Sequence, residues 1–333
     1  MAQAQNCRIV FMGTPDFAAC ILGALARWPV GQIVAVYTQP DRPAGRGHKL
    51  TPSPVKVLAT ELGLSVRQPP DFRNAEDVQA LADLRPDVLV VAAYGLILPQ
   101  AVLDTPRLAP LNVHASLLPR YRGAAPIQRA IMENWQPDAV SGVSIMHMVR
   151  ELDAGPVYAM RSAALAGHTA GSLHDVLAAL GGEAIIAVLR GLLDGTAVCV
   201  EQSADGVSYA AKMQKSDGVV DWSLPVAAVD AQIRGVTPWP GARARFLFTG
   251  MDEACELMLL PGSLGLEQPG YTVSPGEILL DAQGLAVACA DGVYRLGEVK
   301  PQGRKFMRVQ EFCNGYLRGV SQGLCGHALD FGR

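Results

Sequence analysis

The sequence has few charged and aromatic residues and lacks an evident targeting segment. Of its 333 residues, 18% are charged, 6% are aromatic and 50% are hydrophobic, a composition that can bury a core and is not low-complexity. The N-terminus shows no basic stretch followed by an apolar one, so no secretion signal is expected. The longest apolar run, residues 88–98, is too short to span a bilayer and is typical of a buried strand. These absences predict a globular cytoplasmic protein without a membrane anchor.

Disulfide, metal-binding and dinucleotide-binding motifs are also missing from the sequence. The seven cysteines are scattered, odd in number and never arranged as Cys-x-x-Cys, which favours reduced cysteines over disulfides or zinc ligands. The sequence shows no other metal-binding cluster. The turn Gly13-Thr14-Pro15-Asp16-Phe17 is not Gly-x-Gly-x-x-Gly and gives a nicotinamide cofactor only weak support. A strand-to-helix turn and a substrate-contacting loop explain it equally well.

Hydrophobic patterns divide the chain into two parts. The length favours two domains, and residues 1–194 alternate β-branched runs with helical patterns. Strands are expected at residues 8–11, 33–38, 88–93 and 111–114, and helices at residues 17–27, 53–62 and 76–84. This alternation predicts an α/β domain built on a doubly wound parallel sheet, whose ligands collect at the carboxyl ends of the strands.

The C-terminal part of the chain has a different texture. Residues 195–211 are polar and irregular and are interpreted as a linker. A helix is expected at residues 227–234, and short strands are expected at residues 276–280, 285–288 and 293–299, with Gly-containing turns between them. This pattern predicts a small antiparallel β-barrel within residues 212–333.

A polar cluster lies at the end of one expected strand. Asn112, His114 and Ser116 are spaced two residues apart, so they point the same way in an extended chain. Acyl transfer to an amine needs a donor aimed at the oxygen that becomes negative, and a base for the proton that the nitrogen loses. Asn112 and His114 can supply these functions. A buried, hydrogen-bonded histidine at a strand exit is an equally good interpretation.

One acidic residue downstream could complete such a site. The stretch Glu151-Leu152-Asp153-Ala154-Gly155 puts a carboxylate at a turn, and on sequence alone Asp153 is more often a turn residue. Near an imidazole, this carboxylate would hold the ring's tautomer and favour its protonated form. A strong base is not required, because an α-amino group titrates near about 8 and is partly neutral at neutral pH.

Two basic segments stand out in a chain whose formal net charge is −3. Residues 38–56 carry four Lys or Arg residues against one acidic residue and show no hydrophobic pattern, so this loop should be functional or disordered. Residues 295–318 carry six Lys or Arg residues against two acidic ones. A solvated surface explains either segment, but such composition also suits binding to a phosphate backbone. Together they suggest an RNA-binding surface split between two domains.

Several motifs together resemble the folate-dependent formyltransferases. The specific combination is Asn112-x-His114 followed by Ser116-Leu117-Leu118-Pro119, with Leu152-Asp153-x-Gly155 downstream. Within that superfamily, longer segments look like those of members that act on methionyl-tRNA; these segments are residues 13–18, 39–47, 93–99, 120–128, 221–222 and 238–240.

The resemblance implies a fold, a reaction and a set of site residues. It implies a Rossmann-like catalytic domain over residues 1–194, a linker over 195–211, and an OB-like β-barrel over 212–333 that helps to hold tRNA. The implied reaction moves the formyl group of 10-formyltetrahydrofolate to the α-amino group of initiator methionyl-tRNA, without a metal, a membrane or an obligate protein partner. The implied catalytic residues are Asn112, His114 and Asp153. The implied folate contacts are Ser116, Leu117, Leu118, Pro119, Tyr94, Gly95, Leu96 and Ile97, and the implied tRNA contacts are Arg42, Arg46, Lys49, Arg304 and Lys305.

Other functions remain open on the sequence. A glycinamide ribonucleotide formyltransferase would share the three catalytic residues but lack a second domain, and an amino-sugar nucleotide formyltransferase would lack the basic loop. A hydrolase using Ser116 as its nucleophile is disfavoured, because Ser116 is not flanked by the glycines of a Gly-x-Ser-x-Gly turn. A catalytically silent RNA- or folate-binding regulator is a further alternative, against which the presence of all three polar residues speaks.

Overall fold

The computed structural model describes residues 6–44, 49–265 and 273–331, without the side chains of Ala44 and Lys49. The chain divides into two compact units. Unit 1 comprises Met1–Pro126, Ser141–Ala163 and His174–Ala210, and unit 2 comprises Ile127–Val140, Ala164–Leu173 and Ala211–Arg333.

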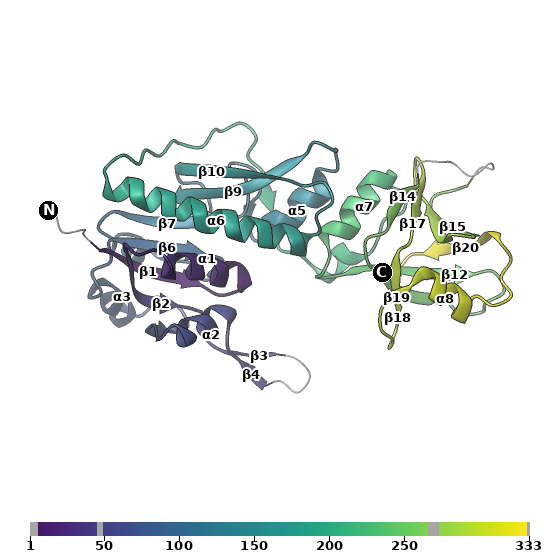
Figure 1. Ribbon diagram of the computed structural model, residues 1–333, viewed down its shortest axis with the longest axis horizontal. Helices are drawn as coiled ribbons and strands as arrows, with labels where there is room; N and C mark the ends of the chain where they lie inside the picture. Colours follow the sequence, from purple (N-terminus) through teal and green to yellow (C-terminus); the bar gives the residue numbers. More distant parts are fainter. Residues whose placement is uncertain (1–5, 45–48, 266–272, 332–333) are drawn as a thin grey trace. The chain divides into compact units, whose positions relative to one another are not determined.

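Unit 1 is built on a seven-stranded sheet with the order β10-β9-β7-β6-β1-β2-β5, counted within the described residues (Figure 1). The strands are β1 Cys7–Gly13, β2 Gly31–Tyr37, β5 Val66–Arg67, β6 Val88–Ala92, β7 Ala109–His114, β9 Val140–His147 and β10 Val157–Ala164. The pairs β1/β2, β1/β6, β2/β5 and β6/β7 are parallel, and β7/β9 is antiparallel. The order reverses about β1, which confirms the predicted doubly wound fold class.

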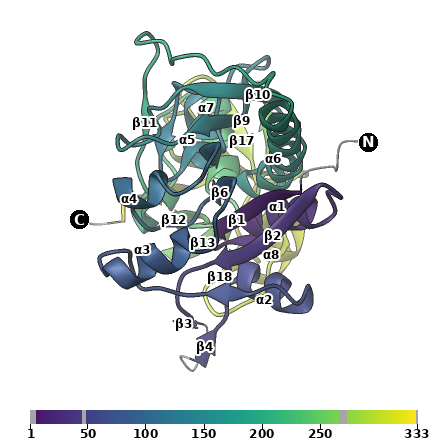
Figure 2. The same cartoon turned by 90° about the vertical axis from the view of Figure 1, so that its left-hand side faces the viewer.

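Helices cover both faces of this sheet. Figure 2 shows α1 Asp16–Ala26 and α6 Ala170–Leu193 on one face, and α3 Ala75–Ala82 and α4 Gln100–Leu103 on the other. Side chains alternate across β1, so Val10 and Met12 pack with Leu81 and Val102 on the α3 and α4 side. The chain also forms α2 Pro54–Glu61 and α5 Pro126–Glu133. The expected helices and strands of this part match α1, α2, α3, β1, β2, β6 and β7 to within a few residues.

The long helix α6 was missed by the sequence pattern, although it is a main support of the sheet. By length and composition alone α6 could cross a membrane, and 44% of its most apolar window is buried in the fold. At its middle, a Cβ on Gly181 would lie 2.9 Å from Val113 and 3.5 Å from Val143, so a glycine is needed for close packing on β7 and β9. The helix thereby lies against the strand that carries Asn112 and His114.

Unit 2 contains a curled antiparallel sheet, consistent with the expected OB-like domain. Its order within the described residues is β14-β17-β16-β15-β20-β12-β13-β18-β19. The strands are β12 Ala242–Phe248, β13 Cys255–Leu259, β14 Ser263–Gly265, β15 Glu277–Asp281, β16 Gly284–Ala288, β17 Val293–Arg295, β18 Glu298–Pro301, β19 Met307–Arg308 and β20 Gly323–Leu329. A 3-10 turn, η1 Lys215–Gly218, and the helices α7 Val226–Gly235 and α8 Val309–Tyr316 accompany the sheet. In the core of this sheet, the ring of Phe248 contacts the rings of Phe246 and Phe312.

Two expectations about local structure need correction. The expected single strand at residues 293–299 is two strands, because β17 pairs with β14 and β16 whereas β18 pairs with β13 and β19. The basic segment 38–56 is not simply a loop, because β3 Arg42–Ala44 and β4 Lys49–Thr51 form an antiparallel hairpin within it. Unit 1 also holds a short parallel pair, β8 Arg122–Gly123 with β11 Tyr209–Ala210.

Candidate active site

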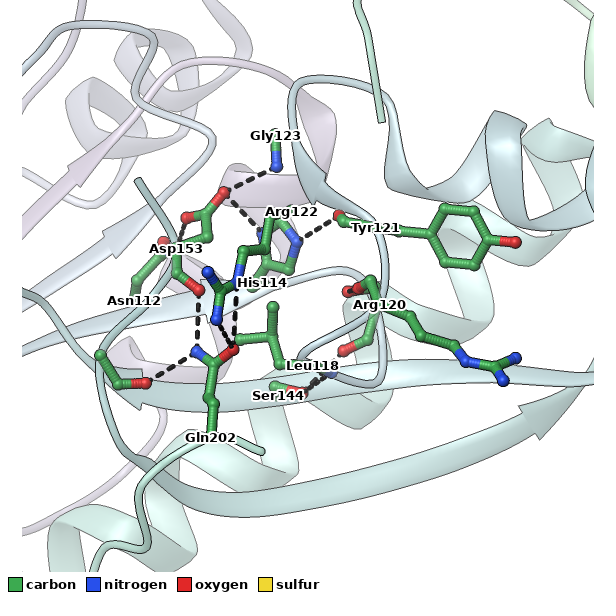
Figure 3. A network of polar contacts seen from close by, with 12 residues as sticks. Asn112, His114, Leu118, Arg120, Tyr121, Arg122, Gly123, Ser144, Asp153 and Gln202 are labelled. Atoms are coloured by element: carbon green, nitrogen blue, oxygen red, sulfur yellow. Dashed lines mark hydrogen bonds and ion pairs between the residues drawn. The ribbon is translucent and has the colours of Figure 1, made fainter. Parts of the chain in front are cut away.

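Asn112 and His114 project from the same side of β7 near its carboxyl end (Figure 3). This strand lies between β6, which is parallel to it, and β9, which is antiparallel. His114 is 6% exposed and Asn112 is half-buried. The amide and the imidazole thus lie at the edge of the sheet where ligands of doubly wound folds collect.

Asp153 reaches the same place from the turn between β9 and β10. The backbone N–H of Gly123 donates to Asp153 Oδ2 at 2.8 Å, and Asn112 Nδ2 donates to Oδ1 at 3.3 Å. His114 Nδ1 lies 3.7 Å from Oδ2. The structure therefore brings together the amide, the imidazole and the carboxylate that the sequence singles out, and holds the carboxylate with a backbone donor (Figure 3).

The two nitrogens of His114 face two acceptors. His114 Nε2 lies 2.9 Å from the carbonyl oxygen of Tyr121, and Nδ1 faces the Asp153 carboxylate. A carbonyl and an ionised carboxylate can only accept, so a doubly protonated ring satisfies both contacts and a neutral ring satisfies one. The peptide that carries the Tyr121 carbonyl is itself held, since its N–H, that of Arg122, donates to the Ser208 carbonyl at 2.9 Å. The ring is therefore oriented by a backbone group as well as by Asp153.

The segment of Ser116, Leu117, Leu118 and Pro119 is held by hydrogen bonds to residues next to it. Ser116 Oγ donates to the carbonyl of Arg120 at 2.6 Å, and the hydroxyl of Ser144 links the Ser116 carbonyl to the Leu118 N–H. The Leu118 side chain packs with Met146 and Val157. Leu117 and Pro119 are the half-buried members of the segment, so their side chains are the ones open to a ligand.

The segment of Tyr94, Gly95, Leu96 and Ile97 follows β6, next to β7. The Tyr94 carbonyl accepts from Thr14 Oγ1 and from Gln39 Nε2, both at 2.9 Å. The Tyr94 ring lies in the hydrophobic core, and burial raises the pKa of its phenol, so the ring is not open to a ligand. Leu96 is half-buried and Ile97 is 94% exposed, which leaves these apolar side chains and the Gly95 backbone available.

Comparison with known families identifies the chain as a relative of formyl-transferring enzymes. Residues 7–189 match the family model described as formyl transferase, and residues 212–317 match the formyl transferase C-terminal domain. The chain belongs to the formyl transferase family. This membership confirms the resemblance drawn from the Asn112, His114 and Asp153 motifs.

Relatives within the formyl transferase family match along nearly the whole chain. A methionyl-tRNA formyltransferase of Desulfovibrio desulfuricans is 55% identical over 332 residues, which cover 98% of this chain and 98% of that protein. A methionyl-tRNA formyltransferase of Chromohalobacter salexigens is 48% identical over 326 residues, covering 96% of this chain and 97% of that protein.

Solved structures share the fold at low sequence identity. An N-formyltransferase from Helicobacter canadensis, in complex with folinic acid and dTDP-3-aminofucose, has a TM-score of 0.64 and 14% identity, covering 88% of this chain and all of that one. HypX from Aquifex aeolicus, solved in complex with tetrahydrofolic acid, has a TM-score of 0.57 and 18% identity. This chain matches 95% of its own length but only 48% of HypX. At these sequence identities the similarity shows a shared fold and nothing more.

The hydrolase alternative lacks the geometry of a nucleophile–histidine–carboxylate triad. Such a triad needs a hydrogen bond from the serine hydroxyl to the imidazole. Ser116 Oγ instead donates to the Arg120 carbonyl, while His114 Nε2 meets the carbonyl of Tyr121. No group of three or more His, Cys, Asp or Glu side chains within the described residues could hold a metal ion.

The residues expected to contact tRNA belong to both units. Arg42 lies in β3 of unit 1, exposed, whereas Arg304 and Lys305 are exposed in the turn between β18 and β19 of unit 2. Arg46 lies outside the described residues, and only the backbone of Lys49, in β4, is described. Two other basic residues of these segments form ion pairs within the chain: Lys56 Nζ lies 2.7 Å from Asp41, and Arg295 Nη2 lies 2.9 Å from Asp281.

Sequence reasoning did not single out the groups that hold the three polar side chains. Gly123 and Tyr121 act through their backbones, which carry no signal of residue type. Gln202 donates to the carbonyls on either side of Ala154, yet it lies in the segment interpreted as a linker. The sequence offers one indication of these groups: Arg122 and Gly123 lie within residues 120–128, a segment that resembles the formyltransferases.

Proposed function

We propose that this chain transfers the formyl group of 10-formyltetrahydrofolate to the α-amino group of methionyl-tRNA. The observation that carries the proposal is the convergence of Asn112, His114 and Asp153 at the end of β7. It occurs in a chain that is 55% identical to a methionyl-tRNA formyltransferase over 98% of its length. Folate and tRNA are the substrates that this activity requires.

In the first step the neutral amine attacks the formyl carbon. A C–N bond forms, and the electron pair of the carbonyl moves to its oxygen, which becomes negative. Asn112 Nδ2 carries two N–H groups and uses one toward Asp153, so the other is free to donate to that oxygen. The donor is oriented before the substrate arrives, because Asp153 is itself held by the Gly123 backbone.

In the second step the C–N10 bond of the folate breaks and a proton changes place. The attacking nitrogen loses one proton and N10 of the leaving tetrahydrofolate gains one, so no proton is consumed. An imidazole can both accept and donate near neutral pH, which makes His114 the group for this transfer. Substrate would replace the Tyr121 carbonyl at Nε2, while Asp153 keeps its contact with Nδ1 and stabilises the positive ring.

The remaining residues divide between the two substrates. Four apolar side chains flank the ends of β6 and β7 and suit the flat faces of the folate's pterin ring: Leu96, Ile97, Leu117 and Pro119. The exposed Arg42, Arg304 and Lys305 suit the phosphates of tRNA. In this proposal residues 1–194 are the catalytic domain, 195–211 a linker and 212–333 a tRNA-holding domain. The enzyme would serve translation initiation in the cytoplasm.

Separate assays with two different acceptors test the proposed function. Purified protein is incubated with 10-formyltetrahydrofolate and either charged methionyl-tRNA or an amino-sugar nucleotide, and the formylated product is quantified. We expect formylation of methionyl-tRNA. Formylation of the sugar nucleotide alone would refute the proposal, and release of free formate without either product would favour a hydrolase.

A further inference from the structure

Gln202 makes hydrogen bonds from both ends of its amide, and all of them concern the candidate site. Its Nε2 donates to the carbonyls of Asp153 and Gly155, each at 2.8 Å. Its Oε1 accepts from Arg122 Nη2 at 2.8 Å and from Arg122 Nε at 3.2 Å (Figure 3). The amide thus joins a buried guanidinium to the backbone of the turn that carries the catalytic carboxylate.

The turn needs such a support because its backbone is in a conformation that side chains disfavour. Asp153 has a φ of +49°, in the left-handed region where a Cβ crowds the backbone. The bond that closes the turn, from the Ala154 N–H to the Glu151 carbonyl, is long at 3.5 Å. The donors of Gln202 hold the carbonyls of residues 153 and 155, on either side of Ala154.

The chain is anchored both before and after Gln202. Two backbone bonds join Val200 to Val157 at 2.8 and 3.0 Å, and β11 pairs with β8 further along. Arg122, which is 7% exposed, lies in β8 next to Gly123, whose N–H holds the Asp153 carboxylate. One short strand therefore fixes the carboxylate directly and the backbone behind it through Gln202.

We propose that Gln202 is a positioning residue for catalysis: with Arg122, it holds the Asp153 turn so that the carboxylate meets Asn112 and His114. This inference rests on the proposed formyl transfer and adds that the segment taken as a linker completes the active site. Gln202 does not touch the reacting atoms, so its removal acts on the rate of the chemical step rather than on substrate binding.

Two substitutions separate the bonds that Gln202 makes. Gln202→Met keeps the side-chain length and removes every hydrogen bond, whereas Gln202→Glu keeps acceptors for Arg122 and loses the donors to the turn. We expect each to lower kcat by up to ~100-fold, since about 1 Å of misplacement can cost that factor. KM for folate and for methionyl-tRNA should stay unchanged. The control is Gln79→Ala, which removes an exposed glutamine of α3 whose amide donates to Asp83. This substitution should leave kcat and KM unchanged.

A double-mutant cycle distinguishes positioning from a general structural role. If Gln202 acts through the carboxylate, Gln202→Met should have almost no further effect on the single-turnover rate of an Asp153→Ala enzyme. Equal losses in the wild-type and Asp153→Ala backgrounds would overturn the proposal, as would wild-type kcat in Gln202→Glu. Thermal melting and folate titration verify folding, and Gln202→Glu carries the test if Gln202→Met does not fold. The wild-type enzyme is assayed first, because absence of formylation there refutes the proposed function rather than this inference.

Discussion

Replacing Asp153 with asparagine removes one charge from the site and almost no volume. The Asp153 carboxylate accepts from the Gly123 N–H at 2.8 Å and from Asn112 Nδ2 at 3.3 Å, and it faces His114 Nδ1 at 3.7 Å. In Asp153→Asn only one amide oxygen can accept, so at least one of these donors loses its partner and the imidazole loses its counter-charge. A hydrogen bond to a charged group contributes ~1.5–3 kcal/mol, so formylation should slow by ~10- to 150-fold.

The assay is single-turnover formylation of methionyl-tRNA with both substrates saturating, so that binding does not limit the rate. The matched control is Asp175→Asn on α6, where Asp175 Oδ1 lies 2.9 Å from His174 Nδ1 at the surface. The control removes the same charge from another His–Asp pair and should leave the rate unchanged. A rate within ~3-fold of wild type for Asp153→Asn, below ~1 kcal/mol, would refute the role given to the carboxylate.

Three further predictions concern the proposed tRNA contacts, the proposed folate contacts and the core. Arg42→Ala should weaken tRNA binding and reduce the slope of log affinity against log salt by about 1, while leaving folate affinity unchanged. A loss of folate affinity instead would contradict the assignment of Arg42 to the tRNA contacts. Gly95→Ala should weaken folate binding by about tenfold in a fluorescence titration, because Gly95 has a φ of +80° and a Cβ there would collide with the Gln39 amide. An unchanged Kd for folate would count against residues 94–97 as a folate contact. Burial raises the pKa of Cys7 from 9.0 to about 12, so above pH 9 the unfolded chain loses a proton that the folded chain keeps. The free energy of unfolding should therefore fall between pH 9 and 12 in urea titrations, with a shallower fall in Cys7→Ala, and equal slopes would refute this cause.

Local periodicity was sufficient for elements whose own residues carry a complete signal. The buried run of β6 and the capped start of α2, where Ser53 Oγ accepts from the Lys56 N–H ahead of Pro54 at the first helical position, follow from residue type alone. By contrast, α6 carries Gly181 and Gly182 at its centre, a pair of weak helix formers that interrupts the pattern. Those glycines are explained by neighbours far away in sequence: Gly181 faces Val113 of β7 and Val143 of β9, and Gly182 faces Ala24 of α1.

The same limit applies to the strands of unit 2 and to the active site. The split of residues 293–299 depends on which neighbours β17 and β18 pair with, and no local pattern records that. At the site, Asn112 and His114 were predictable because they share one strand face, and Asp153 because it stood in a family motif. The groups around them act through backbone atoms or across long separations, such as Gln202, which is 49 positions from Asp153 in the sequence.

The chemistry of this site depends on position more than on accumulated charge. The Asp153 carboxylate is held by the Gly123 N–H, and the turn that carries Asp153 is held by the two donors of Gln202. Backbone groups fixed by the fold need not reorganise when the formyl oxygen becomes negative, so their orientation is already established before reaction. In the proposed function an acidic chain separates its two tasks: exposed Arg and Lys residues attract the phosphates of tRNA, and the site of Asn112, His114 and Asp153 carries out the transfer.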